Sequence, residues 1–152
     1  MKVLIAVDFS EITSSLLEVV PTLLRACEAN SLEIYLIHVA EPNPEFVGWD
    51  AGPDVVRDQV AEMFKREHVQ LEELAEVLRQ RIGAKITPLL IQGPTAETVC
   101  RQAVRLDADM VVVGSHGHGA AYNLVVGSIS SAIIKCIGKP VLVVPHPTGR
   151  KP

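Results

Sequence analysis

Five short runs of apolar, mostly β-branched residues recur along this chain of 152 residues. Most of them are continuous and do not alternate with polar residues. A continuous run of Val, Ile and Leu is typical of a strand buried on both faces, as in a parallel sheet covered by helices on each side. The expected strands are Val3–Val7, Ile34–Val39, Ile86–Ile91, Met110–Val113 and Val141–Val144.

Segments with helical spacing of apolar residues separate the five runs. The expected helices are Ser10–Asn30, Asp54–Ile82, Pro94–Ala108 and Ser128–Ile137, the last ending at Gly138. Pro21 lies inside the first, and an interior proline clashes with the carbonyl four residues earlier, so we expect a kink or break near Leu17 to Val20. Alternating strands and helices with right-handed crossovers predict an α/β fold, a single doubly wound five-stranded parallel sheet with helices on both faces.

The length predicts one compact domain, which we place at residues 1–146 with a C-terminal tail at 147–152. Hydrophobic residues make up 48% and charged residues 21%, which is ordinary for a globular protein. The one long irregular stretch, Glu41–Pro53, holds prolines, glycines and two aromatic residues. A stretch of this kind is either a functional lid or a mobile insertion.

The charge balance argues against polyanionic partners. Lys plus Arg number 14 and Asp plus Glu number 18, which gives a net charge of −4, whereas proteins that bind nucleic acid or anionic membranes usually show the opposite balance. No apolar run approaches the roughly 20 residues that span a bilayer. Met1 and Lys2 precede an apolar run shorter than the roughly 7 to 15 residues of a secretory signal. We therefore expect a cytoplasmic protein that binds neither nucleic acid nor membrane.

The three cysteines, Cys27, Cys100 and Cys136, are odd in number and widely spaced. Such a set gives neither a disulfide framework nor a cluster of zinc ligands. We therefore expect buried thiols.

Histidines raise the question of a metal site. His116 and His118 lie two residues apart, with His38 at the end of the second strand and His146 after the fifth. Zinc usually takes three or four protein ligands, and no carboxylate or cysteine has supporting local spacing. We interpret the loop histidines as solvated and His38 as a satisfied residue within its strand.

Glycines recur after the fourth strand and before the last helix. Gly114, Gly117, Gly127 and Ser128 form the pattern G-x2-G-x9-G-S. Glycines let the backbone approach a ligand closely, and the N–H groups at a helix start suit phosphate. The pattern therefore predicts a phosphate-binding loop, with glycines that serve only turn geometry as the alternative. The Walker pattern and a G-x-G-x-x-G after the first strand are both absent from the sequence.

Over nearly its whole length the chain resembles single-domain universal stress proteins of the ATP-binding kind. The stretches that carry the resemblance are Lys2–Ser10, Ile37–Val39, Gly93–Asp109, Val112–Gly117, Gly127–Ser130 and Lys139–Val144. The resemblance implies strand order 3-2-1-4-5, as in adenine nucleotide alpha hydrolase-like folds, and a bound ATP. It implies that Asp8 lies by the ribose and phosphates, that the Val39 backbone binds the adenine, and that Gly114 lies against the ribose. By the same resemblance the phosphates are held by Gly117, Gly127, Ser128, Ile129 and Ser130.

Two of these residues admit a second role. An Asp8 carboxylate beside a triphosphate would repel it unless Asp8 binds a ribose hydroxyl or a cation, which implies Mg²⁺ or Mn²⁺ with the nucleotide. The alternative is that Asp8 caps the first helix. Ser128 either contacts a phosphate or serves as the N-cap of the last helix. No Lys or Arg occurs from His118 to Ser131, so backbone N–H groups, the helix dipole and a metal would hold the phosphates.

Our leading hypothesis is an ATP-binding stress-response regulator, a homodimeric interaction module with at most slow hydrolysis and an unidentified protein partner. In the family that the chain resembles, dimers commonly pair the last strands, and Val141–Val144 is an apolar run that a monomer would leave at a sheet edge. One alternative is an enzyme, an ATP hydrolase or nucleotidyl transferase. Another is a scaffold that binds AMP, a cyclic nucleotide or no nucleotide.

Overall fold

The computed structural model describes residues 1–40, 54–115 and 126–145, with the backbone alone at 54–59. The predictions for Gly117, for the Glu41–Pro53 stretch, for His116, His118 and His146, and for the tail lie outside these residues. The elements in chain order are β1 (Lys2–Val7), α1 (Glu11–Leu24), a short 3₁₀ turn (Ala29–Ser31), β2 (Glu33–Ala40), α2 (Asp54–Ile82), β3 (Lys85–Gln92), α3 (Thr95–Arg105), β4 (Met110–Gly114), α4 (Ser128–Cys136) and β5 (Val141–Val144).

The five strands form one parallel sheet in the order β3-β2-β1-β4-β5. This confirms the predicted fold class and strand order. The central strand β1 is deeply buried, with Val3, Leu4 and Ile5 at 0%, 0% and 1% exposure. Because the strands are parallel, their carboxyl ends meet along one edge of the sheet, where ligands bind in folds of this type.

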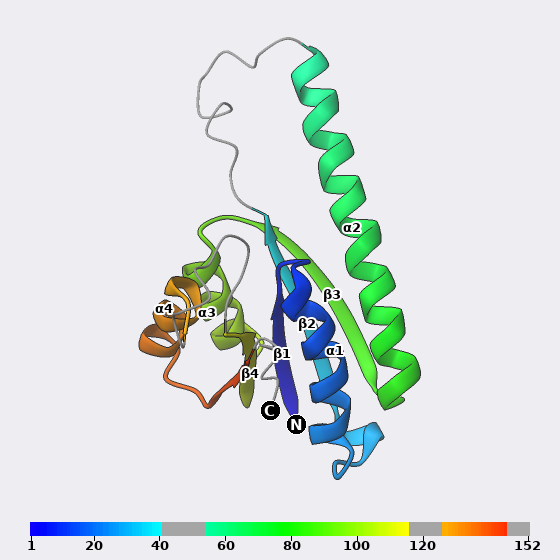
Figure 1. The fold of residues 1–152 in the computed structure, drawn as a ribbon, viewed down its shortest axis with the longest axis vertical. Coiled ribbons are helices and arrows are strands. Elements are labelled where there is room, and N and C mark those ends of the chain that lie inside the picture. The colour runs from blue at the N-terminus through cyan, green and yellow to red at the C-terminus, as the bar shows by residue number, and fades with distance from the viewer. Residues whose placement is uncertain (41–53, 116–125, 146–152) are drawn as a thin grey trace, which may run out of the picture.

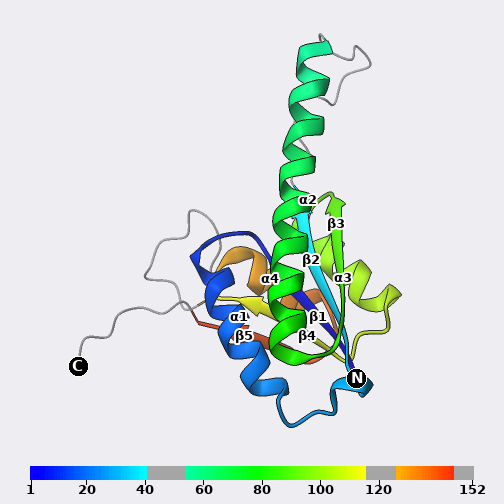
Figure 2. The ribbon, with the colours of Figure 1, turned by 90° about the vertical axis from the view of Figure 1, so that its right-hand side faces the viewer.

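Two helical layers cover the two faces of the sheet, with α1 and α2 on one side and α3 and α4 on the other (Figure 1). On the first face, Leu16 of α1 and Leu71 of α2 belong to the same buried cluster as Ile5 of β1. On the second face, Val99 of α3 and Ile133 of α4 join a separate cluster. The amino-terminal part of α2 extends beyond the sheet (Figure 2).

Pro21 does not break α1, which runs without interruption from Glu11 to Leu24. Of the predicted kink or break, the break is therefore wrong. Proline lacks the N–H that would bond to the carbonyl of Leu17, four residues earlier. Arg81 of α2 supplies the missing donor, since its Nη1 lies 2.9 Å from the Leu17 oxygen. A contact between two helices thus satisfies the carbonyl that the proline leaves free.

Arg81→Ala should lower the free energy of unfolding by about 1 kcal/mol, because it removes a charge-assisted hydrogen bond at an exposed site. The cost should shrink when Pro21→Ala is also present, since the backbone of residue 21 then donates to Leu17. A urea-denaturation double-mutant cycle over the two positions measures this coupling. Costs that simply add would show that Arg81 does not replace the proline's missing donor.

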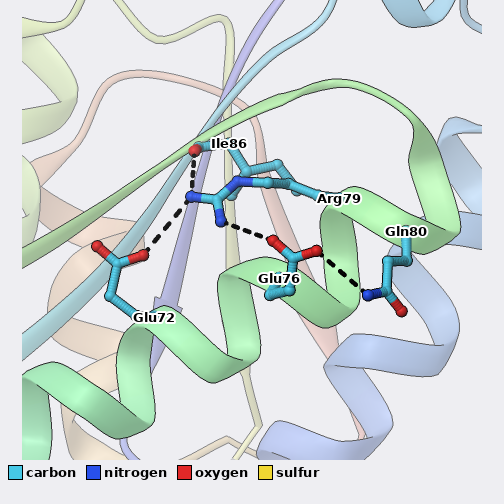
Figure 3. A network of polar contacts seen from close by, with 5 residues as sticks. All are labelled: Glu72, Glu76, Arg79, Gln80 and Ile86. Atoms are coloured by element: carbon cyan, nitrogen blue, oxygen red, sulfur yellow. Dashed lines mark hydrogen bonds and ion pairs between the residues drawn. The ribbon is translucent and has the colours of Figure 1, made fainter.

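The last turns of α2 are attached to the start of β3 through Arg79 (Figure 3). Its Nη2 donates to the Ile86 carbonyl at 3.0 Å, and its Nη1 donates to Glu76 at 3.1 Å. The guanidinium of Arg79, followed by the amide of Gln80, lowers the pKa of Glu76. The helix ends at Ile82, and Gly83 follows with its N–H donated to the Arg79 carbonyl. Gly83 has a φ of +72°, a conformation that glycine adopts without strain.

The prediction of three buried thiols is wrong: two of the cysteines are paired, and the third, Cys27, is free but only partly buried. Cys100 of α3 and Cys136 of α4 form a disulfide across 36 residues of chain, with their Cα atoms 6.4 Å apart. Only Cys27 is a free thiol. Sequence spacing gave no sign of this pair because the side-by-side packing of α3 and α4 brings the two residues within bonding range.

Among the described residues, no helix is both long and apolar enough to cross a membrane.

Candidate functional site

A cavity of about 750 Å³ opens at the carboxyl ends of β1, β2 and β4. The ends of these strands form its floor, the first turn of α4 forms one wall, and α1 and α2 contribute to the opposite wall. Seven of the eight predicted site residues line it: Asp8, Val39, Gly114, Gly127, Ser128, Ile129 and Ser130. Gly117 lies outside the described residues.

The first turn of α4 presents backbone donors to the cavity. Gly127 is the N-cap, with extended backbone and no capping side chain, so the alternative that Ser128 caps this helix is wrong. The Gly127 N–H is bonded to the Ser115 carbonyl at 2.6 Å. The N–H groups of Ser128, Ile129 and Ser130 belong to the first turn, which has no intrahelical acceptors for them. Together with the positive end of the helix dipole, they suit an anion.

Ser130 and Gly114 connect this turn to the sheet. The Ser130 hydroxyl donates to the Gly114 carbonyl at 2.6 Å, and Ser130 is only 7% exposed. Because the hydroxyl proton is already donated to Gly114, the donor that Ser130 can offer to a ligand is its backbone N–H. A Cβ on Gly114 would lie 2.8 Å from the side chain of Ile12, so close packing of α1 on β4 requires glycine there.

Asp8 stabilises the turn between β1 and α1. Its Oδ1 accepts hydrogen bonds from the Ser10 N–H at 3.0 Å and from the Ser10 hydroxyl at 2.5 Å. Asp8 thus accepts from an N–H near Ser10, as expected of a cap, but the N-cap of α1 is Ser10 and has no side-chain capping bond, so the alternative that Asp8 caps this helix is wrong. Between them, Phe9 has a φ of 60°, an uncommon conformation for a non-glycine residue, and its ring centroid lies 4.2 Å from that of His38.

The end of β2 offers a second set of backbone groups. β1 and β2 are paired up to Val7 and His38, so β2 continues past β1 for two more residues, Val39 and Ala40. The Ala40 carbonyl accepts from Gly93 on the β3 side. Because backbone groups of successive strand residues point to opposite neighbours, the N–H and C=O of Val39 point toward the side of β1. Because β1 has already ended at this level, no β1 residue is paired with the Val39 N–H and C=O.

The charged groups of the described lining are all acidic. Asp8 and Glu67 contribute carboxylates, and neither Lys nor Arg lines the cavity among these residues. The described part of the chain holds no cluster of three His, Cys, Asp or Glu residues arranged for a metal ion. An anion here would therefore be held by backbone N–H groups and by a cation that it carries.

Sequence reasoning missed the wall that α1 and α2 contribute. Ile12, Met63, Glu67 and Gln70 line the cavity, as does His38, whose Nδ1 lies 2.9 Å from the Val7 carbonyl oxygen. The carboxylate of Glu67 was the strongest sequence signal for this wall. From the sequence alone, however, one acidic residue on an amphipathic helix cannot be distinguished from the acidic residues that face solvent.

Comparison with known proteins gives a consistent result. The model of the universal stress protein family matches residues 1–145. Universal stress protein MJ0531 of Methanocaldococcus jannaschii is 27% identical over 146 residues, which cover 96% of this chain and 82% of that protein. The solved structure of the protein MJ0577 superposes with a TM-score of 0.79 at 26% identity and covers 97% of both chains.

Two solved structures of universal stress proteins contain adenine nucleotides. One is a complex with cAMP, with a TM-score of 0.68 at 14% identity over 95% of this chain and 96% of that one. The other is the protein from Archaeoglobus fulgidus in complex with dAMP, with a TM-score of 0.62 at 18% identity over 94% of this chain and 96% of that one. At this identity the likeness shows a shared fold.

Proposed function

Because the chain belongs to the universal stress protein family, we propose that it is a regulatory protein that binds an adenine nucleotide, ATP in the first place, in the cavity at the carboxyl ends of β1, β2 and β4. The observation that carries this proposal is the first turn of α4: its residues Ser128, Ile129 and Ser130 line the cavity, and their N–H groups have no acceptors within the helix. Phosphate binds readily at such a helix start. Relatives of the same fold have been solved with cAMP and dAMP, which supports adenine as the base.

The strand order suggests how a nucleotide would lie. In the sheet, β2, β1 and β4 are neighbours in that order. Phosphates at α4 and Gly127 would place the ribose near Asp8 after β1, and the base near Val39 at the end of β2. The Val39 N–H and C=O form a donor and acceptor pair of the kind that matches the edge of adenine. We propose Gly117 as a further phosphate contact from the sequence pattern.

A divalent cation fits the charge of this cavity. With Asp8 in the described lining and neither Lys nor Arg, a triphosphate would meet like charge without compensation. Mg²⁺ or Mn²⁺ carried by the nucleotide and held by Asp8 would neutralise this repulsion.

We propose slow hydrolysis at most. The described lining offers no cation to stabilise a departing phosphate, which enzymes of phosphoryl transfer use extensively. A turnover above about 1 s⁻¹ would favour an ATP hydrolase or nucleotidyl transferase instead.

The proposed assembly is a cytoplasmic homodimer paired through β5. This strand is an edge of the sheet, and Val141, Leu142 and Val143 are only half-buried in the single chain. A second copy would cover this apolar edge. The proposed dimer would signal the nucleotide state to another protein.

Thermal melting with and without Mg-ATP tests the proposal. At 100 times the dissociation constant, a ligand adds about 2.7 kcal/mol, which raises the Tm by about 5 to 10 °C for a chain of this size. AMP and cAMP, measured in parallel, show which adenine nucleotide is preferred. An unchanged Tm with all three nucleotides would contradict nucleotide binding.

A further inference from the structure

We propose that Glu67 selects the base of the nucleotide by accepting a hydrogen bond from the 6-amino group of adenine. This inference rests on the proposed function, because it assigns a role at the base end of the same cavity. It concerns a residue of α2, a helix that the sequence pattern of the site did not include.

Glu67 is a buried acceptor without a donor. Its Oε2 is buried and has no hydrogen-bond partner among the described residues. The nearest candidate is His38 Nε2, which lies 4.0 Å away, beyond hydrogen-bond distance. A buried carboxylate oxygen without a donor is costly, and a ligand that supplies a donor would remove this cost.

His38 leaves that acceptor available. Its Nδ1 lies 2.9 Å from the Val7 carbonyl oxygen, and because a carbonyl only accepts, the ring proton is on Nδ1. In the neutral ring, Nε2 then carries a lone pair toward Glu67 and has no hydrogen to donate. The ring of Phe9 packs against the imidazole at an interplanar angle of 42° and further restricts its orientation. His38 Nε2 and the Glu67 carboxylate thus present two neighbouring acceptors on this wall, to which Gln70 also belongs.

The wall lies on the side where the base would be. His38 is on β2 next to Val39, at the opposite side of β1 from Gly114 and the α4 turn. The side chain of Glu67 is 21% exposed, and the soft terminal torsion of a glutamate lets either oxygen turn to the cavity. This placement also keeps the carboxylate at the far end of the cavity from the phosphates.

The chemistry of the purine then decides the specificity. Adenine carries an amino group at position 6 with two N–H donors, of which the Val39 carbonyl takes one and Glu67 takes the other. Guanine and hypoxanthine carry a carbonyl oxygen at that position, which would meet the carboxylate acceptor to acceptor. A site built around a hydrogen bond rejects the analogue that lacks the partner.

Isothermal titration calorimetry of ATP and ITP, both with Mg²⁺, tests the assignment in the intact protein. The wild type should bind ATP at least about tenfold tighter than ITP. Glu67→Gln should reduce this ATP-to-ITP ratio by about tenfold, because the amide of glutamine can turn to donate to the O6 atom of ITP. Its nucleotide-free Tm should not fall, since the substitution removes an unpaired buried charge.

Glu73→Gln is the matched control, because Glu73 is an exposed residue of the same helix and does not line the cavity. This variant should keep the wild-type ratio. An unchanged ratio in Glu67→Gln would overturn the assignment, as would a lower Tm without nucleotide, which would indicate a structural pair with His38. Equal losses of affinity for ATP and ITP in Glu67→Gln, with the affinity for 2′-deoxy-ATP unchanged, would place Glu67 at the ribose 2′-hydroxyl and also overturn it. If the wild type binds neither ATP nor ITP, the proposed function itself fails.

Discussion

Gly127→Val should abolish the nucleotide-induced rise in Tm, with a loss of affinity of more than about 100-fold, roughly 2.7 kcal/mol or more. Gly127 is the N-cap of α4 and lines the cavity beside the N–H groups proposed to bind phosphate. Its backbone is extended, with a φ of −69°, so valine can adopt it without left-handed strain. The added side chain would occupy the space of the phosphates, and the fold should persist with a modest loss of helix capping.

Ala132→Val is the matched control. Ala132 is an exposed residue of the same helix that does not line the cavity, and the change adds a β-branched side chain there too. It should keep the full Mg-ATP shift, and circular dichroism should show both variants folded. A Gly127→Val protein that binds Mg-ATP like the wild type would show that the phosphates lie elsewhere.

Cys136→Ser should lower the free energy of unfolding by about 4 kcal/mol. The disulfide between Cys100 and Cys136 closes a loop of 36 residues, and cross-linking a loop of this length removes that much entropy from the unfolded chain. For a domain of this size the Tm should fall by about 8 to 15 °C. Urea denaturation without reductant measures the loss in free energy of unfolding. Wild-type protein treated with dithiothreitol should have the same free energy of unfolding as the variant.

Cys27→Ser provides the control for removing a sulfur atom, because Cys27 is a free, partly buried thiol. It should change stability by far less than Cys136→Ser. Thiol titration of unfolded, unreduced protein should find one reactive thiol per chain in the wild type. A count of three thiols would contradict the disulfide.

Much of the fold could be predicted because local burial is encoded in local periodicity. The run Val3–Val7 is apolar at every position since β1 is covered on both faces, and the structure buries all of it except Ala6, which is partly buried. The helix ending near Gly138 was also predicted, and this residue has a φ of +57°, which glycine adopts readily after a helix. In the site, the pattern around Gly127 indicated where a helix would begin, and with it where N–H donors would be exposed.

The sequence by itself determined the five strands, the helices that connect them, and the helix start at which we propose that phosphate binds, because each depends on neighbours a few residues apart. Only the tertiary structure decided the pairs that join distant segments. Arg81 reaches the carbonyl freed by Pro21, Cys100 meets Cys136, and Glu67 faces the cavity beside His38. These contacts arise from how helices pack on the sheet and on each other, and no spacing along the chain encodes the distance between two packed surfaces.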